Sequence, residues 1–304
     1  MAKGLDLHKA YDTFRVTPNK PIKLKEYDTA WNGMDKLGKV NKDTAKEQAD
    51  DLLEESVKEL SEAQGLLWAN NKYSLLVILQ GMDASGKDST IKHVMSGINP
   101  QGCQVTSFKV PSEEELDHDF LWRYSKALPE RGRVGIFNRS YYEEVLVVRV
   151  HPELLERQRL PNVKINDAFW QARFEEINAF EKHLYNNGTQ VVKFFLNVSK
   201  EEQKDRLLER TDDPQKRWKF SAADLKERDC WGAYMKAFEE AINSTSTVHA
   251  PWYVIPADRK WIARSVVASI LASTIGTLKL EYPRLSEEKN QELEEARKLL
   301  KAEP

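Results

Sequence analysis

The chain contains 304 residues, of which 40% are hydrophobic and 31% are charged, a composition typical of a globular protein with a sizeable core. Its formal net charge of -2 excludes a broad basic surface for duplex nucleic acid, so any anion site must be a local cluster of cations. The two cysteines, Cys103 and Cys230, exclude a disulfide framework and a multi-cysteine zinc site.

The N-terminal segment lacks the pattern of a secretion signal. Charged residues interrupt the apolar ones in "MAKGLDLHKAYDTFRV", and no apolar run elsewhere approaches the roughly 20 residues of a membrane span. We therefore expect a cytoplasmic protein without membrane contact. Residues 1–42 mix Pro, Lys, Asp and Gly and are expected to form an extended arm, whereas apolar residues three and four apart over 43–69 predict a long amphipathic helix.

The next part of the chain alternates between short apolar stretches and helical ones. Near-continuous apolar runs are typical of strands buried on both faces, and the alternation predicts a five-stranded parallel sheet flanked by helices. The predicted strands are residues 73–80, 104–109, 133–137, 190–197 and 252–256. The predicted helices are residues 87–97, 113–127, 165–187, 199–211, 221–243 and 259–280.

These elements predict a single α/β domain over residues 1–304. Its core comprises residues 73–200 and 245–280, a helical lid region covers 201–243, and a charged helix covers 286–304. Ligands of such a sheet bind beyond the carboxyl ends of the strands. The residues that follow each strand are therefore the candidates for chemistry.

The stretch "LLVILQGMDASGKDST", residues 75–90, has the outline of a phosphate-binding loop. Its glycines permit close approach of the backbone to phosphate, its lysine supplies a point charge, and the following helix start supplies N–H donors. A preceding apolar strand and a following helix are the context that this motif requires. The predicted phosphate ligands are Gly81, Ala84, Ser85, Gly86, Lys87, Asp88 and Ser89.

Two carboxylates are unusual in this loop. Asp83 would be repelled by phosphate unless a cation lies between them, so it is a candidate Mg²⁺ ligand, with capping of a turn as the alternative. Asp88 stands where the usual motif has Ser or Thr. It belongs to the first turn of the predicted helix, where a carboxylate is favourable to the helix dipole, and this favours a structural role.

The second motif is "RVGIFNRSYYEEVLVVRVHPE", residues 133–153. Asn138 ends the strand at the position where many nucleoside triphosphatases carry a Mg²⁺-binding Asp. Arg139 follows as a natural clamp for a transferring phosphoryl group, although a salt bridge to Glu143 or Glu144 would also explain it. Glu143 is our candidate for the charge that Asn138 lacks. Arg149 is a weaker candidate in the same motif.

Two further stretches carry candidate ligands. In "FKVPSEEELDHDFLWR", residues 108–123, Asp119 and Arg123 belong to a helix that leans over a substrate or simply packs on the core. Residues 201–231 are rich in cations, which form either a lid that closes over phosphates or a solvated helix pair. The predicted phosphate ligands in this region are Arg206, Arg210, Lys216, Arg217, Lys219 and Arg228.

Together these motifs resemble the family-2 polyphosphate kinases. The resemblance rests on "GMDASGKDSTIKHVM", "FKVPSEEELDHDFLWR", "GIFNRSYYEEVLVVRVHPE", "WKFSAADLKER" and "APWYVIPADRKW", and the FNRSYYE form is similar to the class III branch. It implies a P-loop kinase fold with a helical lid, like that of thymidylate kinase. It also implies Mg²⁺-dependent, reversible phosphoryl transfer between inorganic polyphosphate and purine nucleoside mono- and diphosphates.

The resemblance also implies roles for individual residues. Asp83 matches the family's metal-binding and catalytic loop Asp, Lys87 its phosphate-binding Lys, and Arg139 the Arg after the third strand. The basic residues of the lid match those that line a polyphosphate channel. Many members have Asp where Asn138 stands, which makes Glu143 the expected second metal ligand. The acceptor nucleotide is expected beside Asp119, Arg123, Asn138, Glu143 and Arg149, and the family implies a homo-oligomer, a dimer or tetramer.

Two other functions share the loop and the lid. An ATP-dependent nucleoside monophosphate kinase should carry a hydroxyl at position 88 and a Mg²⁺-binding Asp at position 138. A nucleotide-sensing switch protein would use the same loop without useful turnover. The number of cations in the lid favours a long polyanion over both alternatives.

Overall fold

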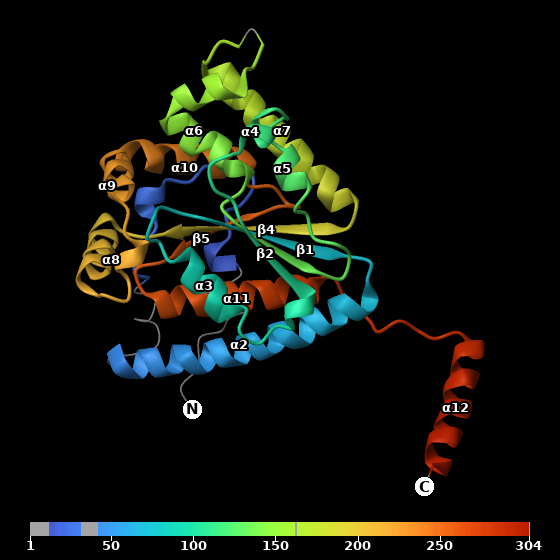
Figure 1. Cartoon of the computed structure of the whole chain (residues 1–304). Helices are drawn as coiled ribbons and strands as arrows, with labels where there is room; N and C mark the ends of the chain where they lie inside the picture. Colours follow the sequence, from blue (N-terminus) through green and yellow to red (C-terminus); the bar gives the residue numbers. More distant parts are fainter. Residues whose placement is uncertain (1–11, 32–41, 162, 304) are drawn as a thin grey trace.

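The protein is built on a five-stranded parallel sheet (Figure 1). The computed structural model describes residues 12–31, 42–161 and 163–303. Every neighbouring pair of strands is parallel, and the strand order is β2-β3-β1-β4-β5, which confirms the predicted α/β class. The strands are β1 (Ser74–Gln80), β2 (Cys103–Ser107), β3 (Val134–Asn138), β4 (Thr189–Asn197) and β5 (Trp252–Pro256).

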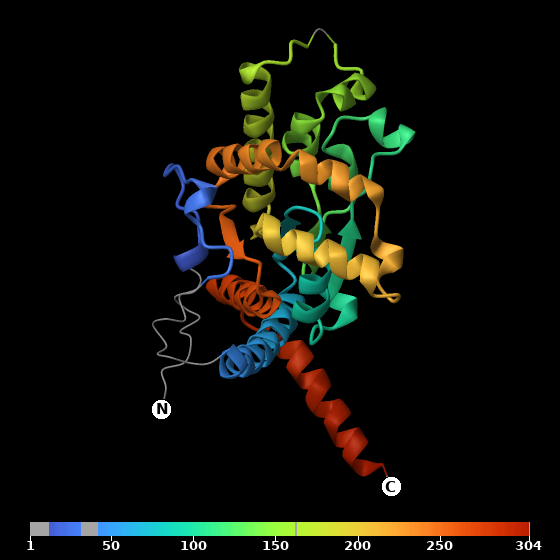
Figure 2. The ribbon, with the colours of Figure 1, turned by 90° about the vertical axis from the view of Figure 1, so that its left-hand side faces the viewer.

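Helices cover both faces of this sheet. On one face lie α3 (Lys87–Val94) and α11 (Lys260–Thr277), and α2 (Lys42–Asn70) packs along α11 (Figure 1). The other face carries α7 (Asp167–Asn186) and α10 (Trp231–Thr245), which contact each other. Figure 2 shows the same layers after a quarter turn.

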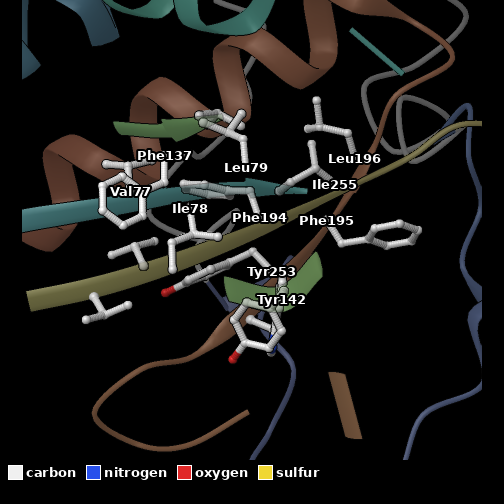
Figure 3. Close-up of a cluster of buried hydrophobic side chains, with 14 of the residues drawn as sticks. Val77, Ile78, Leu79, Phe137, Tyr142, Phe194, Phe195, Leu196, Tyr253 and Ile255 are labelled. Carbon is white, nitrogen blue, oxygen red and sulfur yellow. The ribbon is translucent and has the colours of Figure 1, made fainter. Parts of the chain in front are cut away.

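The central strands are buried because helices lie on both of their faces. All seven residues of β1 and all five of β5 are buried, as the continuous apolar runs of the sequence predict. Figure 3 shows how side chains from β1, β3, β4 and β5 interlock with Tyr142 from the segment after β3. Strand β2 stands at the edge of the sheet, and several of its side chains are exposed.

The described part of the N-terminal arm lies along the outer strand. Phe14, Val16 and Leu24 are buried, and the Val16 amide donates to the Trp252 carbonyl at 2.9 Å. This segment therefore covers the edge of β5, which would otherwise expose unpaired backbone groups. The rest of the predicted arm, residues 1–11 and 32–41, lies outside the described residues.

Two predicted helices are interrupted. The helix predicted over 113–127 is two single turns, α4 (Glu113–Leu116) and α5 (Trp122–Ser125). A capping box between Ser112 and Glu115 starts the first turn, and the Asp119 carboxylate accepts a hydrogen bond from the Leu121 amide, which bends the chain between the turns. The continuous helix predicted over 221–243 is likewise wrong, since Cys230 separates α9 (Ala222–Asp229) from α10, which begins at Trp231.

Two helices complete the fold outside the layers. Helix α8 (Lys200–Asp212) follows β4 directly and lies beside α9 (Figure 1). Helix α12 (Glu287–Ala302) projects from the body in both views, and all of its side chains are exposed. None of the helices in the described ranges combines the length and hydrophobicity that a membrane span needs.

A buried ion pair supports the segment that follows β3. The Lys193 ammonium and the Glu181 carboxylate lie 2.6 Å apart, and both side chains are fully buried. Glu181 also accepts hydrogen bonds from the hydroxyls of Tyr141 and Tyr142, each at 2.9 Å. Burial lowers the pKa of Lys193, and the Glu181 carboxylate opposes this shift. The pair thus ties β4 and α7 to the two tyrosines of the second motif.

We expect Lys193→Met to lower the free energy of unfolding by about 3–5 kcal/mol, because it leaves a buried carboxylate without its cation. Chemical denaturation measures the loss. The double variant Lys193→Met, Glu181→Gln removes the uncompensated charge and should recover much of the stability. A loss of about 1 kcal/mol or less in the single variant, the magnitude of an exposed ion pair, would contradict this account.

Candidate active site

A cationic cavity of about 560 Å³ opens at the carboxyl ends of the strands. The whole loop from Asp83 to Ser89 lines it, together with Asn138 and Arg139 from the end of β3. Three acidic side chains in the lining, Asp83, Asp88 and Glu209, face nine basic ones, so the cavity is strongly positive in a chain of net charge -2. The basic residues are Lys87, Lys109, Arg139, Arg206, Arg210, Lys216, Lys219, Lys260 and Arg264.

The loop after β1 needs its glycines. Gly81 has a φ of +151°, and a Cβ there would come within 2.9 Å of the Leu196 carbonyl on the neighbouring strand. Gly86, the N-cap of α3, has a φ of +106°. Ala84 adopts the left-handed region between them. The loop therefore turns sharply enough to present backbone N–H groups at the start of a helix, the arrangement that binds phosphate.

Lys87 lies inside this loop. Its ammonium donates to the carbonyls of Gly81 at 2.7 Å and Met82 at 3.1 Å. Burial lowers the pKa of Lys87, and the Asp83 carboxylate opposes the shift. The ammonium is thus held across the loop by neutral carbonyls, which a phosphate can replace as a stronger, charged acceptor.

Asp83 and Arg139 form an ion pair across the cavity. The Arg139 guanidinium donates to Asp83 Oδ1 at 2.9 Å and remains 41% exposed. Its backbone has a φ of +65°, a strained conformation for a non-glycine residue and one that is common at functional sites. Burial alone would lower the pKa of Arg139, but Glu143 and Asp83 outweigh burial and raise it. The sequence offered a salt bridge to Glu143 or Glu144 as the alternative role of Arg139, but within the described residues its ion pair is with Asp83.

Asn138 and Asp88 contact each other directly. Asn138 Nδ2 donates to Asp88 Oδ1 at 2.7 Å, whereas Asn138 Oδ1 is buried without a hydrogen-bond partner in the described structure. An Asp at position 138 would place two carboxylates at this distance. The amide at 138 and the carboxylate at 88 are therefore complementary, and the Asp88 side chain is held beside the cavity at the first turn of α3.

A second cavity of about 150 Å³ adjoins the first at Arg139, which lines both. Its walls combine apolar side chains, including Val147, Val148 and Leu154, with the cations Lys109, Arg123 and Arg157. Glu143 and Glu144 also line this cavity. Burial raises the pKa of the Glu143 carboxyl, and the cations of Arg139 and Lys87 oppose it. Glu143 thus lies beside Arg139 but lines the second cavity rather than the first.

Some predicted ligands lie elsewhere. Arg149 pairs with Glu240 and lies over the Trp170 ring, and it lines none of the described cavities. Arg217 and Arg228 do not line the cationic cavity either; Arg228 donates to the Lys200 carbonyl at 2.7 Å. These arginines are used in local packing of the helices that carry them.

Two other predicted nucleotide ligands, Asp119 and Arg123, lie outside the cationic cavity. Asp119 lines a small cavity of about 80 Å³ next to the second cavity. Arg123 lines both, donates to the Lys109 carbonyl at 3.0 Å and pairs with Glu115. The structure therefore brings Arg123 close to Lys109, while Asp119 serves the turn before α5.

Three cations of the cavity were missing from the predicted set. Lys109 ends the predicted second strand, and Lys260 follows the fifth, within the segments where ligands of a parallel sheet are expected. Arg264 lies one turn beyond Lys260 on α11 and donates to the Ser89 hydroxyl at 2.6 Å. Helical spacing of four residues from Lys260 was the available signal for Arg264.

The chain is similar in sequence to proteins of one family. A family model described as polyphosphate kinase 2 matches residues 40–283. The ADP-polyphosphate phosphotransferase of Rhodopseudomonas palustris is 52% identical over 257 residues, which cover 84% of this chain and 89% of that protein. The AMP/ADP-polyphosphate phosphotransferase of Meiothermus ruber is 43% identical over 275 residues, 89% of this chain and 95% of that one.

A solved structure shows the same likeness in three dimensions. The crystal structure of polyphosphate kinase 2 from Arthrobacter aurescens matches with a TM-score of 0.82 at 38% sequence identity, and the match covers 96% of each chain. The fold, the phosphate-binding loop and the length of the sequence match all indicate the same family. The chain belongs to the polyphosphate kinase 2 family.

Proposed function

We propose that the protein transfers the terminal phosphoryl group of inorganic polyphosphate to purine nucleoside mono- and diphosphates, reversibly. The observation that carries this proposal is the pair of adjoining cavities with Arg139 in the wall of both. One cavity is strongly cationic and suits a chain of phosphates, and the other combines apolar walls with cations and suits a nucleotide. Relatives named ADP- and AMP/ADP-polyphosphate phosphotransferases support this assignment.

The two substrates would meet at Arg139. Polyphosphate would bind the loop N–H groups, Lys87, Arg210 of α8 and the cations of α11. The nucleotide base would pack against Val147, Val148 and Leu154, with its phosphates directed towards Lys109 and Arg123. The boundary between the cavities is then the place where donor and acceptor phosphates come together.

The chemical step needs charge neutralisation more than proton transfer. An oxygen of the acceptor's terminal phosphate, already ionised near neutral pH, forms the new O–P bond while the P–O bond to the rest of the polyphosphate breaks. The released chain end takes up the electron pair. Repulsion between the two polyanions is the main obstacle, and positioned cations overcome it. Lys87 and Arg139 are the side chains that would stabilise the transferring phosphoryl group.

The residues around the loop fit a Mg²⁺ ion. No group of three or more His, Cys, Asp or Glu side chains arranged for a metal is found in the part of the chain that the structure describes. Mg²⁺ with phosphates, however, needs only one or two carboxylates, the remaining ligands being phosphate oxygens and water. Asp83 and Asn138 line the same cavity, and the buried Oδ1 of Asn138 has no hydrogen-bond partner within the described structure. Bound there, the ion would neutralise phosphate charge. Glu143, the other carboxylate candidate, lies in the wall of the second cavity, which adjoins the first at Arg139.

One assay separates this function from an ATP-dependent nucleoside monophosphate kinase. The purified protein is given ADP, Mg²⁺ and polyphosphate, and ATP formation is followed. We expect ATP to appear and to depend on polyphosphate. Absence of ATP here, together with formation of ADP from AMP plus ATP, would overturn the proposal in favour of the monophosphate kinase.

We expect Asp83→Asn and Lys87→Ala each to lower the rate of ATP formation about 100- to 1,000-fold, since each removes one electrostatic contact to the reacting phosphates. Initial rates at saturating ADP and polyphosphate measure the effect. Glu130→Gln, an exposed change in the segment that precedes β3, is the matched control and should leave the rate unchanged. A near-normal rate in either site variant would remove that residue from the mechanism.

Asn138→Asp should make the thermal stability depend on Mg²⁺. The new carboxylate would lie beside that of Asp88, and the repulsion lowers the melting temperature in the presence of a chelator. Because a divalent cation can bridge two carboxylates, added Mg²⁺ should raise the melting temperature of the variant more than that of the wild type. Equal Mg²⁺ responses of the two proteins would count against a cation site at this position.

A further inference from the structure

Side chains of helix α8 donate hydrogen bonds directly to backbone carbonyls of the phosphate-binding loop after β1. Building on the proposed function, we propose that Arg206 is a positioning residue that sets the conformation of the loop, and not a polyphosphate ligand as the sequence predicted. Its guanidinium connects the loop to the turn after β5. Arg210 is then the first residue of α8 that binds polyphosphate directly.

All five N–H donors of Arg206 have acceptors within the protein. Nε donates to Glu202 at 2.7 Å, and Nη1 donates to the carbonyls of Ala84 at 3.0 Å and Ser85 at 2.9 Å. Nη2 donates to the carbonyls of Ala257 at 2.6 Å and Asp258 at 3.1 Å. The side chain is buried, so no donor remains for a phosphate in this arrangement.

A second side chain of α8 extends this contact to the preceding loop residue. Gln203 Nε2 donates to the Asp83 carbonyl at 2.9 Å, and Gln203 is itself fixed by a 2.8 Å bond from Arg228. Three consecutive loop carbonyls, those of residues 83, 84 and 85, therefore point towards α8. Arg228, another predicted phosphate ligand, here supports the residue that holds the loop.

The orientation of these carbonyls determines where the loop amides point. In a trans peptide the N–H group lies opposite the C=O group, so carbonyls directed at α8 turn the following amides away from it. The amides of Ala84 and Gly86 are thereby directed away from α8, while the Ser85 amide between them donates to the Met82 carbonyl at 3.1 Å. Backbone amides that point into such a concave loop are what binds phosphate. Arg206 would thus act on the substrate through the loop backbone.

Lysine cannot take over this function. Its single ammonium carries three donors at one point, whereas the guanidinium spans acceptors on two separate segments. Arg206→Lys therefore keeps the positive charge but loses the hydrogen bonds that connect the loop to the turn after β5. For a direct phosphate ligand the same change would preserve most of the interaction. This difference makes the conservative substitution informative.

Arg210 offers a contrast on the same helix. It lines the cavity and pairs with Asp224 at 2.9 Å, an acidic partner that a phosphate can replace. Arg131 offers a control outside the site. Its guanidinium also donates to two backbone carbonyls, those of Lys72 at 2.6 Å and Asn187 at 3.1 Å, but it lines none of the described cavities.

The test combines kinetics with hydrogen exchange of the substrate-free protein. We expect Arg206→Lys to lower kcat about 100-fold, the effect of a small misplacement of reacting groups, with a change in KM for polyphosphate of less than about threefold. Amide exchange of the peptide covering residues 81–90 should rise without any substrate present. Arg210→Lys should leave this exchange unchanged, and Arg131→Lys should leave both exchange and kinetics unchanged.

A different pattern of results would overturn the proposal. If Arg206→Lys leaves loop exchange unchanged and mainly raises KM for polyphosphate, Arg206 is a ligand and the proposal is overturned. If Arg206→Lys does not fold, Gln203→Met carries the test: raised loop exchange supports the proposal and unchanged exchange overturns it. Because exchange is measured without substrate, it remains decisive even if the wild type forms no ATP and the proposed function fails.

Discussion

Mutual repulsion between phosphate groups is the constraint on which this site depends. A chain with a net charge of -2 meets this constraint by collecting nine basic side chains around one cavity. They come from the loop after β1, the ends of β2 and β3, helix α8, the segment that follows α8, and helix α11. No single segment supplies them. The parallel sheet is what makes the collection possible, because it brings the carboxyl ends of all five strands to one edge.

The positions of these cations depend in turn on interactions beneath the cavity. Arg139 follows β3 in a left-handed conformation, and its amide donates to the Leu79 carbonyl at 3.1 Å. Two residues later the tyrosines of the same motif reach the Glu181–Lys193 pair inside the protein. A strained residue and side chains fixed by a buried charge network thus follow one another along the chain, so the segment that carries Arg139 is held in place on its C-terminal side.

The sequence was sufficient to predict the strands and the loop but not the use of each arginine. The strands were predictable because burial on both faces leaves long apolar runs, as in β1 and β4. The interruption after α4 was not predictable, because it depends on which backbone amide donates a hydrogen bond to the Asp119 side chain. Arg206 and Arg210 are indistinguishable by composition and lie one helical turn apart. Arg206 nevertheless donates to carbonyls of the loop and of the turn after β5, whereas Arg210 pairs with the Asp224 carboxylate of α9. Only the packing of α8 against the loop distinguishes the roles of these two arginines.

The contact between Asn138 and Asp88 makes these two positions dependent on each other. The usual phosphate loop has a hydroxyl at position 88. With a carboxylate there instead, an Asp at position 138 would place two negative charges within hydrogen-bond distance, whereas the Asn138 amide donates a hydrogen bond. The free-energy effect of a substitution at either position therefore depends on the residue at the other, and the two effects are not additive.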